Sequence, residues 1–181
     1  STTADAAGAW SFTPAAPLGV GSHVISATAI DLVGATGPAS APLAVVIDLG
    51  APATPLLSGL APGSDTGVSA TDGLTSDDRP ILRGTAEANA TVTILEGTTL
   101  IGTATADGAG SWTFQPASAL AAGSHAFTAT VTDLAGNTSG TAAPLTVEVD
   151  ATAPDAPTIA GLTTATDTGL SDTDGVTGVT T

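Results

Sequence analysis

Short stretches in which apolar residues alternate with Thr follow one another along the chain at even spacing. Val92 and Ile94 alternate with Thr in one stretch, and Phe127, Ala129 and Val131 do so in another. A period of two with Thr on the opposite face is typical of half-buried antiparallel strands. Gly, Asn, Asp and Pro fill the gaps, and no segment keeps a helical period. The pattern predicts an all-β protein.

Seven such strands are expected in the middle of the chain. They fall at about 56–60, 80–86, 90–97, 99–106, 111–116, 125–132 and 143–149. Seven short antiparallel strands in about 100 residues predict an immunoglobulin-like β-sandwich. Trp10 and Trp112, each followed two residues later by a Phe, are the expected core residues.

The chain repeats itself, without a gap, at one fixed offset. Trp112 follows Trp10 by 102 residues (112 − 10). The same offset relates Asp5 to Asp107, His23 to His125, Asp31 to Asp133, Asp48 to Asp150, Asp65 to Asp167 and Asp72 to Asp174. Such self-similarity marks a tandem array, and a period of this length is a whole domain and not a solenoid unit.

The offset divides the chain into three parts. Residues 1–48 are predicted to be the C-terminal half of one immunoglobulin-like repeat, 49–150 a complete repeat, and 151–181 the N-terminal part of the next. We expect the two partial repeats to be poorly ordered or to be completed by neighbouring repeats, since neither contains all the strands of a sandwich.

The charge of the chain excludes some classes of function. The chain has two Arg residues, no Lys, and 17 Asp and Glu residues, which gives a net charge of −15. Binding to nucleic acid needs clustered Lys and Arg, so this class is excluded. No apolar run reaches the roughly 18 residues of a membrane span, and an anionic membrane surface would repel the chain. The chain has no Cys, so a core with few aromatic residues needs a device other than a disulfide to stabilise it.

Most of the acids are Asp, which is both a turn former and a hard oxygen ligand. Seven antiparallel strands put the N- and C-terminal ends of a repeat at opposite ends of the sandwich. Asp48, where one repeat ends, is therefore expected beside the loop that contains Asp133 and Asn137 in the next repeat. Asp150 has the equivalent place at the following junction. Converging carboxylates repel one another unless a cation lies among them, and Ca²⁺ accepts six to eight oxygen ligands. We therefore predict Ca²⁺ at the junctions, with Glu87, Asp107 and Asp31 as further candidate ligands.

A second acidic cluster lies between the first two strands expected in the complete repeat. It contains Asp65 and Asp72-Gly73, and it recurs as Asp167 and Asp174-Gly175. Gly permits the tight turns that direct carboxylates and carbonyls inward. The spacing is not that of an EF-hand, because no helices flank it and Val68 falls where the first Asp is needed. The cluster predicts a second calcium site.

Simpler interpretations remain open for these residues. The Asp clusters are alternatively ordinary turn formers and solubilising charge, and Glu87 with Asn89 is alternatively a plain turn. The Ser-His pair that contains His125 recurs in the repeat and has no marked acid partner, so we expect a structural role and no catalysis. Arg79 and Arg83 are expected to pair with Asp77 or Asp78 at the surface.

Four segments resemble the bacterial immunoglobulin-like repeats of giant, type I-secreted surface adhesins. They are 84–92 (GTAEANATV), 108–114 (GAGSWTF), 129–137 (ATVTDLAGN) and 150–157 (DATAPDAP). The resemblance implies a secreted, extracellular stalk, often calcium-bound, that serves cell adhesion or biofilm formation. It also implies that the partners are neighbouring repeats and, through a distal tip outside this chain, a host or abiotic surface.

The favoured function is a structural spacer and not an enzyme. A glycan-binding module is the first alternative, but it needs exposed aromatic residues in a groove, and the chain has only two Trp and three Phe. An accessory domain of a secreted enzyme is the second, and it predicts a catalytic segment elsewhere in the parent protein.

Overall fold

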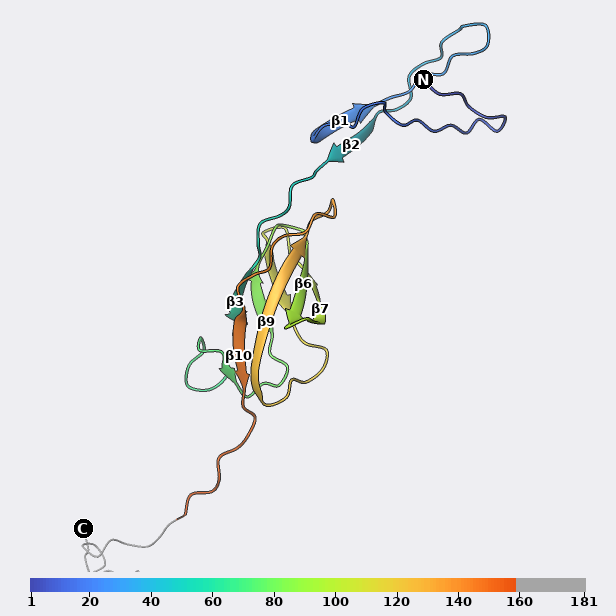
Figure 1. Cartoon of the computed structure of the whole chain (residues 1–181). Coiled ribbons are helices and arrows are strands. Elements are labelled where there is room, and N and C mark those ends of the chain that lie inside the picture. Colours follow the sequence, from blue (N-terminus) through green and yellow to red (C-terminus); the bar gives the residue numbers. More distant parts are fainter. Residues whose placement is uncertain (159–181) are drawn as a thin grey trace, which may run out of the picture. The chain divides into compact units, whose positions relative to one another are not determined.

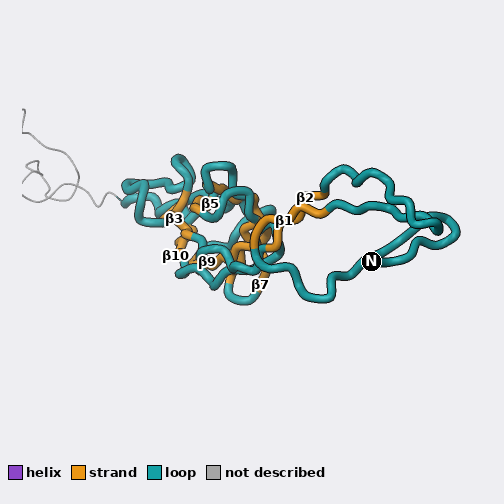
Figure 2. The backbone as a smooth tube through the Cα atoms, turned by 90° about the horizontal axis from the view of Figure 1, so that it is seen from above, coloured by secondary structure: helices purple, strands orange, loops and turns teal. Residues whose placement is uncertain are grey.

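The computed structural model describes residues 1–158 of the chain. Residues 1–151 form one compact unit, and 152–158 have no regular secondary structure. Ten strands account for the secondary structure of the described residues, which Figure 2 colours in orange between teal loops. No helix long and apolar enough to cross a membrane occurs in this part of the chain. The all-β prediction is confirmed.

Eight of the strands form a two-layered sandwich between residues 56 and 149 (Figure 1). One sheet has the order β4-β10-β9-β6-β7 and the other has the order β3-β5-β8. The strands are β3 (Leu56–Leu60), β4 (Leu74–Thr75), β5 (Leu82–Thr85), β6 (Thr91–Glu96), β7 (Thr99–Thr105), β8 (Ser111–Phe114), β9 (Gly123–Thr132) and β10 (Leu145–Val149). This arrangement is an immunoglobulin-like β-sandwich, as the sequence predicts.

The core lies between the two sheets and follows from the alternation of residues. Val92 and Ile94 of β6 and Val131 of β9 are fully buried, as are Leu82 of β5 and Phe127. Their Thr neighbours point the other way because successive side chains of a strand lie on opposite faces. Trp112 of β8 packs into the same cluster and is 3% exposed.

The seven predicted strands are all present, with ends shifted by at most a few residues. β4 was not predicted, and it corrects the expectation that every strand is antiparallel, because Leu74 and Thr75 pair in parallel with Glu148 and Val149 of β10. Two residues are too few to show a period in the sequence. The pairing also depends on the edge of β10, which a local pattern does not report.

Residues 1–48 contain an antiparallel hairpin of β1 (Gly21–Ile25) and β2 (Leu43–Ile47). Its register pairs Gly21 with Ile47, and β9 pairs with β10 in the equivalent register 102 residues later. The partial repeat thus contains one pair of strands of the sandwich. The repeat seen in the sequence therefore extends to the backbone pairing.

The two Trp residues differ sharply in exposure. Trp112 is 3% exposed, whereas Trp10 is 57% exposed and Phe12 is 55% exposed. The sequence prediction of a core role is right for Trp112 and wrong for Trp10 in this structure. In the sandwich β5 pairs with β8, the strand that carries Trp112, and residues 1–48 contain no counterpart of β5.

Candidate functional sites

Four of the Asp residues build the same turn. Each is followed three positions later by a Gly with a positive φ, which lies between 82° and 93° in all four turns. The Oδ1 atom accepts hydrogen bonds from the backbone N–H groups two and four residues on, at 2.8–3.0 Å. The four residues are Asp5, Asp31, Asp107 and Asp133. Their carboxylates hold the chain reversal, which supports the turn-former interpretation.

The Asp133 turn differs from the other three by the residue at its end. Asn137 takes the place that Ala9, Ala35 and Ser111 have in the other turns. Its side-chain Nδ2 donates to Asp133 Oδ2 at 2.8 Å and to the backbone carbonyl of Asp48 at 3.2 Å. The predicted neighbours Asp48, Asp133 and Asn137 are thus brought together.

This hydrogen bonding changes the electrostatics of Asp133. The Asn137 side-chain bond lowers the pKa of Asp133 below 3.8, burial opposes it, and the backbone N–H groups of the turn add to the lowering. Both carboxylate oxygens carry N–H donors, since Oδ1 accepts two backbone bonds and Oδ2 accepts the amide. Hydrogen bonds to the ionised form stabilise it.

The other predicted junction residues are spread over several loops. Asp48 Oδ1 accepts the N–H of Gly50 at 2.9 Å, and Asp150 N donates to Thr75 O at 2.8 Å. Glu87 is exposed, and Asn89 has a φ of 63°, the left-handed conformation that Asn tolerates in turns. The plain-turn interpretation therefore accounts for Asn89.

The described junction residues are short of ligands for calcium in this conformation. No group of three or more His, Cys, Asp or Glu side chains that could hold a metal ion occurs in residues 1–158. The Asn137 NH₂ group occupies the point on which Asp133 Oδ2 and Asp48 O converge. A half-turn of that amide would present Oδ1 there instead of a donor. Calcium would still need several further oxygens from water or from other groups.

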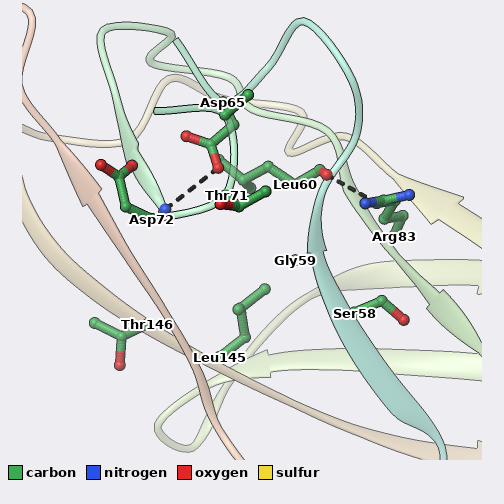
Figure 3. Close-up of a pocket in the computed structure, with 11 residues that line it drawn as sticks. Ser58, Gly59, Leu60, Asp65, Thr71, Asp72, Arg83, Leu145 and Thr146 are labelled. Atoms are coloured by element: carbon green, nitrogen blue, oxygen red, sulfur yellow. Dashed lines mark hydrogen bonds between the residues drawn. The ribbon is translucent and has the colours of Figure 1, made fainter. Parts of the chain in front are cut away.

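The second predicted cluster does converge. Asp65 and Asp72 line one pocket of about 160 Å³ between the β3–β4 loop, β3 and β10 (Figure 3). Asp65 is only 8% exposed, although it is a charged residue in a loop. Its Oδ2 accepts the N–H of Gly73 at 3.3 Å, and Asp72 Oδ1 accepts the N–H of Leu74 at 3.1 Å. The equivalent Asp167 and Asp174 lie outside the described residues.

One ionisable pair was missed by the sequence analysis. His125 Nδ1 lies 2.7 Å from Glu96 Oε1, and Nε2 lies 2.9 Å from Ala121 O. Partial burial disfavours the charged ring, but the Ala121 and Glu96 hydrogen bonds and the charges of Glu96 and Glu148 outweigh it and raise the pKa of His125 above 6.5. The ring also stacks on Phe127, with centroids 6.2 Å apart. Glu96 is 29 residues away in sequence, so only the register of β6 and β9 brings the pair together.

The expected surface pairing of the two Arg residues with Asp77 or Asp78 is wrong. Arg79 Nε donates to Pro116 O at 3.1 Å, and Arg83 Nε donates to Leu60 O at 2.9 Å. Both guanidinium groups therefore donate to backbone carbonyls of distant segments instead of to the neighbouring carboxylates.

The order of the strands in the two sheets defines an immunoglobulin-like domain. The family model of the bacterial Ig-like domain matches residues 52–151. The chain therefore belongs to the bacterial Ig-like domain family. None of the curated proteins compared with the chain matches it.

Proposed function

We propose that the chain is a spacer in a tandem array of immunoglobulin-like domains on a bacterial cell surface. The observation that carries the proposal is the 102-residue repeat, which relates the β1–β2 hairpin to the β9–β10 hairpin in the same register. Repetition of a whole domain adds length without adding a new type of site. Family membership supports an extracellular setting, and the secreted location and the adhesin context are part of the proposal.

The path of the chain through residues 49–151 suits such a role. Figure 1 shows the chain entering this sandwich at one end and leaving it after β10 at the other. A domain that is entered and left at opposite ends adds its own length to an array. The proposed partners are the neighbouring repeats of the same chain and, through a tip outside this chain, a host or abiotic surface. No catalytic role is part of the proposal.

Calcium binding between repeats is the finer part of the proposal. A net charge of −15 makes neighbouring repeats repel one another at low salt. Extracellular calcium modules bind at about 10⁻⁴–10⁻³ M. At about 1 mM calcium, a site with a constant near 10⁻⁴ M adds roughly 1.4 kcal/mol to the bound form. The contact between Asn137 and Asp48 supports a junction at this place, and a turned Asn137 amide would add an oxygen ligand.

Small-angle scattering on three tandem copies of residues 49–150, with calcium and then with chelator, tests the spacer function. The maximum dimension should grow by about one domain length per repeat, and it should fall when calcium is removed. A chain that scatters as a compact particle in calcium would contradict the spacer function. An extended chain whose dimensions do not change with chelator would support the spacer function and contradict calcium binding at the junctions.

In tandem copies of residues 49–150, the counterpart of Asp48 is Asp150 of the preceding copy, 102 residues later. Changing that Asp150 and the Asp133 of the next copy to Ala, at one junction, should reproduce the chelator effect at that junction alone. Asp78→Ala is the control, because Asp78 is an exposed acid that is not among the predicted ligands. A control that shortens the array as much as the double variant would assign the effect to the loss of negative charge.

No observation favours glycan binding over the spacer role. The exposed Trp10 resembles a sugar platform, but its equivalent in the complete sandwich, Trp112, is buried in the core. A residue that is buried in the core of one repeat is expected to be buried in another repeat when all the strands of that repeat are present.

A further inference from the structure

The two sheets of the sandwich end in four edge strands, which differ in length and in protection. β4 has 2 residues, β8 has 4 and β3 has 5, whereas β7 has 7. Short length, charge and Pro are features that keep an edge strand from pairing with another chain. The shorter edges have charged or Pro residues beside them, namely Asp72 and Asp77 at β4, Pro55 and Pro62 at β3, and Pro116 after β8.

The β7 edge has neither charge nor Pro. Residues 97–106, between Glu96 and Asp107, are Gly, Thr, Leu, Ile and Ala only. Leu100 is 61% exposed, and the side chains of Thr103 and Thr105 are exposed as well. In a chain with a net charge of −15, this strand is a surface on which a second copy meets no like charge.

The outer side of β7 presents backbone groups that the fold does not use. β7 has a strand neighbour, β6, on one side only (Figure 1). Ala106 N donates to Ala90 O at 3.0 Å, so Ala106 faces the β6 side. Backbone groups alternate between the two sides of a strand, so the N–H and C=O groups of Thr103 and Thr105 point away from β6. Within residues 1–158 these groups pair with no other strand or loop.

The strand is also held in place from the core side. A Cβ on Gly102 would lie 2.5 Å from the Phe114 ring, so this ring of β8 packs directly against the β7 backbone. Ile101 packs against the core cluster, and the register with β6 is regular from Gly102 to Thr105. A preformed edge loses less conformational entropy on binding than a flexible segment does.

We propose that β7 pairs antiparallel with β7 of a second copy of this chain. Such a pairing is symmetric about a two-fold axis, so each copy supplies the same groups to the other. Centred on Thr103, it places the two outward N–H groups and the two outward C=O groups of this residue opposite one another as a hydrogen-bonded pair. It also places two Thr side chains directly across from each other, which is a favourable cross-strand pair.

Repetition of the domain strengthens a contact that is weak by itself. A single strand edge buries less than the roughly 1,200 Å² of a stable interface, so one pair of domains associates weakly. Both copies have the same 102-residue period, so a pairing made at one domain recurs at the next, and linked contacts add avidity. Ser1 and Thr3, the counterparts of Thr103 and Thr105 in the preceding repeat, are again uncharged hydroxyl residues.

The direction of the pairing defines the partner. Because the paired strands are antiparallel, the two chains run in opposite directions, as arrays from two facing cells do. This proposal deepens the proposed function by naming a partner, and it rests on that function for the array. The pairing itself needs only the sandwich of one chain, so the two proposals fail in different experiments.

Sedimentation equilibrium of the full chain, over a series that reaches millimolar concentration, tests the pairing. We expect a reversible equilibrium between monomer and dimer. Amide hydrogen exchange at Thr103 and Thr105 should slow as the dimer fills, because their N–H groups then have acceptors. A chain that stays monomeric at every concentration, or a dimer that leaves the exchange of both amides unchanged, would overturn the proposal.

Thr103→Pro removes an outward N–H that the fold does not use, and edge strands tolerate Pro at such positions. The two hydrogen bonds lost across the two-fold axis should raise the dissociation constant of the dimer about 10-fold or more. Thr103→Lys places two like charges opposite each other and serves if Thr103→Pro does not fold.

Thr85→Lys is the matched control, because Thr85 is also an exposed strand residue but lies on β5, which has strand neighbours on both sides. It should form the dimer as the wild type does. A dimer that persists in both Thr103 variants, or that is lost equally in Thr85→Lys, would overturn the assignment to β7. Either result leaves the scattering test of the spacer unaffected.

Discussion

The side-chain amide of Asn137 donates a hydrogen bond to the backbone carbonyl of Asp48, a residue 89 positions earlier in the chain. The same nitrogen holds Asp133 Oδ2 at 2.8 Å. One neutral amide thus joins the segment that enters the complete repeat to the β9–β10 loop. It does so with N–H donors at the point where the sequence predicts a cation.

Asn137→Ala should raise the pKa of Asp133 toward 3.8, because the Asn137 side chain is the largest cause of its lowering. The stability that the ionised Asp133 contributes is present above that value and is lost as the pH falls through the lower pKa of the folded state. The variant should therefore be less sensitive to acid. The carboxyl ¹³C signal of Asp133, followed from pH 6 to pH 2, measures the change.

Gln115→Ala is the control for this variant, since it removes another side-chain amide that donates to a backbone carbonyl, that of Arg79. Its Asp133 signal should titrate as in the wild type. If Asn137→Ala leaves that titration unchanged, the amide does not hold Asp133 in solution, and the junction is open to a metal ligand in its place.

Glu96→Gln should lower the pKa of His125 from its raised value. Both ring nitrogens of His125 face acceptors, so both donate only when the ring is protonated. The pair contributes stability fully below about pH 6.5, and this contribution is lost as the pH rises through the raised pKa of the folded state. The wild type should lose more stability between pH 6 and pH 9 than the variant. Imidazole NMR titration and melting at both pH values measure this.

Glu148→Gln distinguishes the effect of a nearby charge on the pKa of His125 from the effect of a hydrogen bond. Glu148 raises the pKa of His125 only through its charge, whereas Glu96 also accepts a hydrogen bond. We expect Glu148→Gln to have the smaller effect. Equal effects of the two variants would show that the hydrogen bond is absent in solution.

Local periodicity was enough to predict the sandwich and most of its strands. Val92 and Ile94 share a face in a strand by geometry alone, and the 102-residue offset needs no structure at all. The turn role of Asp133 was also readable, because it depends on a Gly only three residues away. These features are local, so the sequence carries them directly.

The features that escaped prediction depend on tertiary register. β4 exists because two loop residues meet the edge of β10, and the pair of His125 and Glu96 exists because β6 and β9 align. The exposed Trp10 lies in a local sequence similar to that of Trp112, with a Gly two residues before and a Phe two residues after, and only the strands across the core distinguish the two. No short window of sequence contains that information.

Trp112→Ala should destabilise the complete repeat by about 3–5 kcal/mol, because it removes a large core ring and leaves a cavity. Trp10→Ala is the matched change at the equivalent position, and it should alter the stability of that repeat by less than about 0.5 kcal/mol, since Trp10 is 57% exposed. Denaturant unfolding followed by circular dichroism compares the two variants. Similar losses for both would mean that Trp10 is buried in solution.

Gly84→Ala should be the most damaging small change in the described sandwich. A Cβ on Gly84 would meet Leu56 O at 1.9 Å and the Trp112 ring at 2.4 Å. Neither is the free end of a flexible side chain, so β3 and β8 would have to separate from β5. We expect a loss of about 3 kcal/mol or more in the free energy of unfolding.

Gly108→Ala provides the control for the loss of a glycine, because nothing lies within 4 Å of its added methyl group. It should be neutral or stabilise the domain by about 0.4–1 kcal/mol through the entropy of the unfolded chain. Chemical denaturation measures the free energy of unfolding of both variants. If Gly84→Ala unfolds at the same denaturant concentration as Gly108→Ala, the close packing of β3 on the Trp112 face of β5 is wrong. The assignment of Trp112 as the central residue of the core would then be wrong with it.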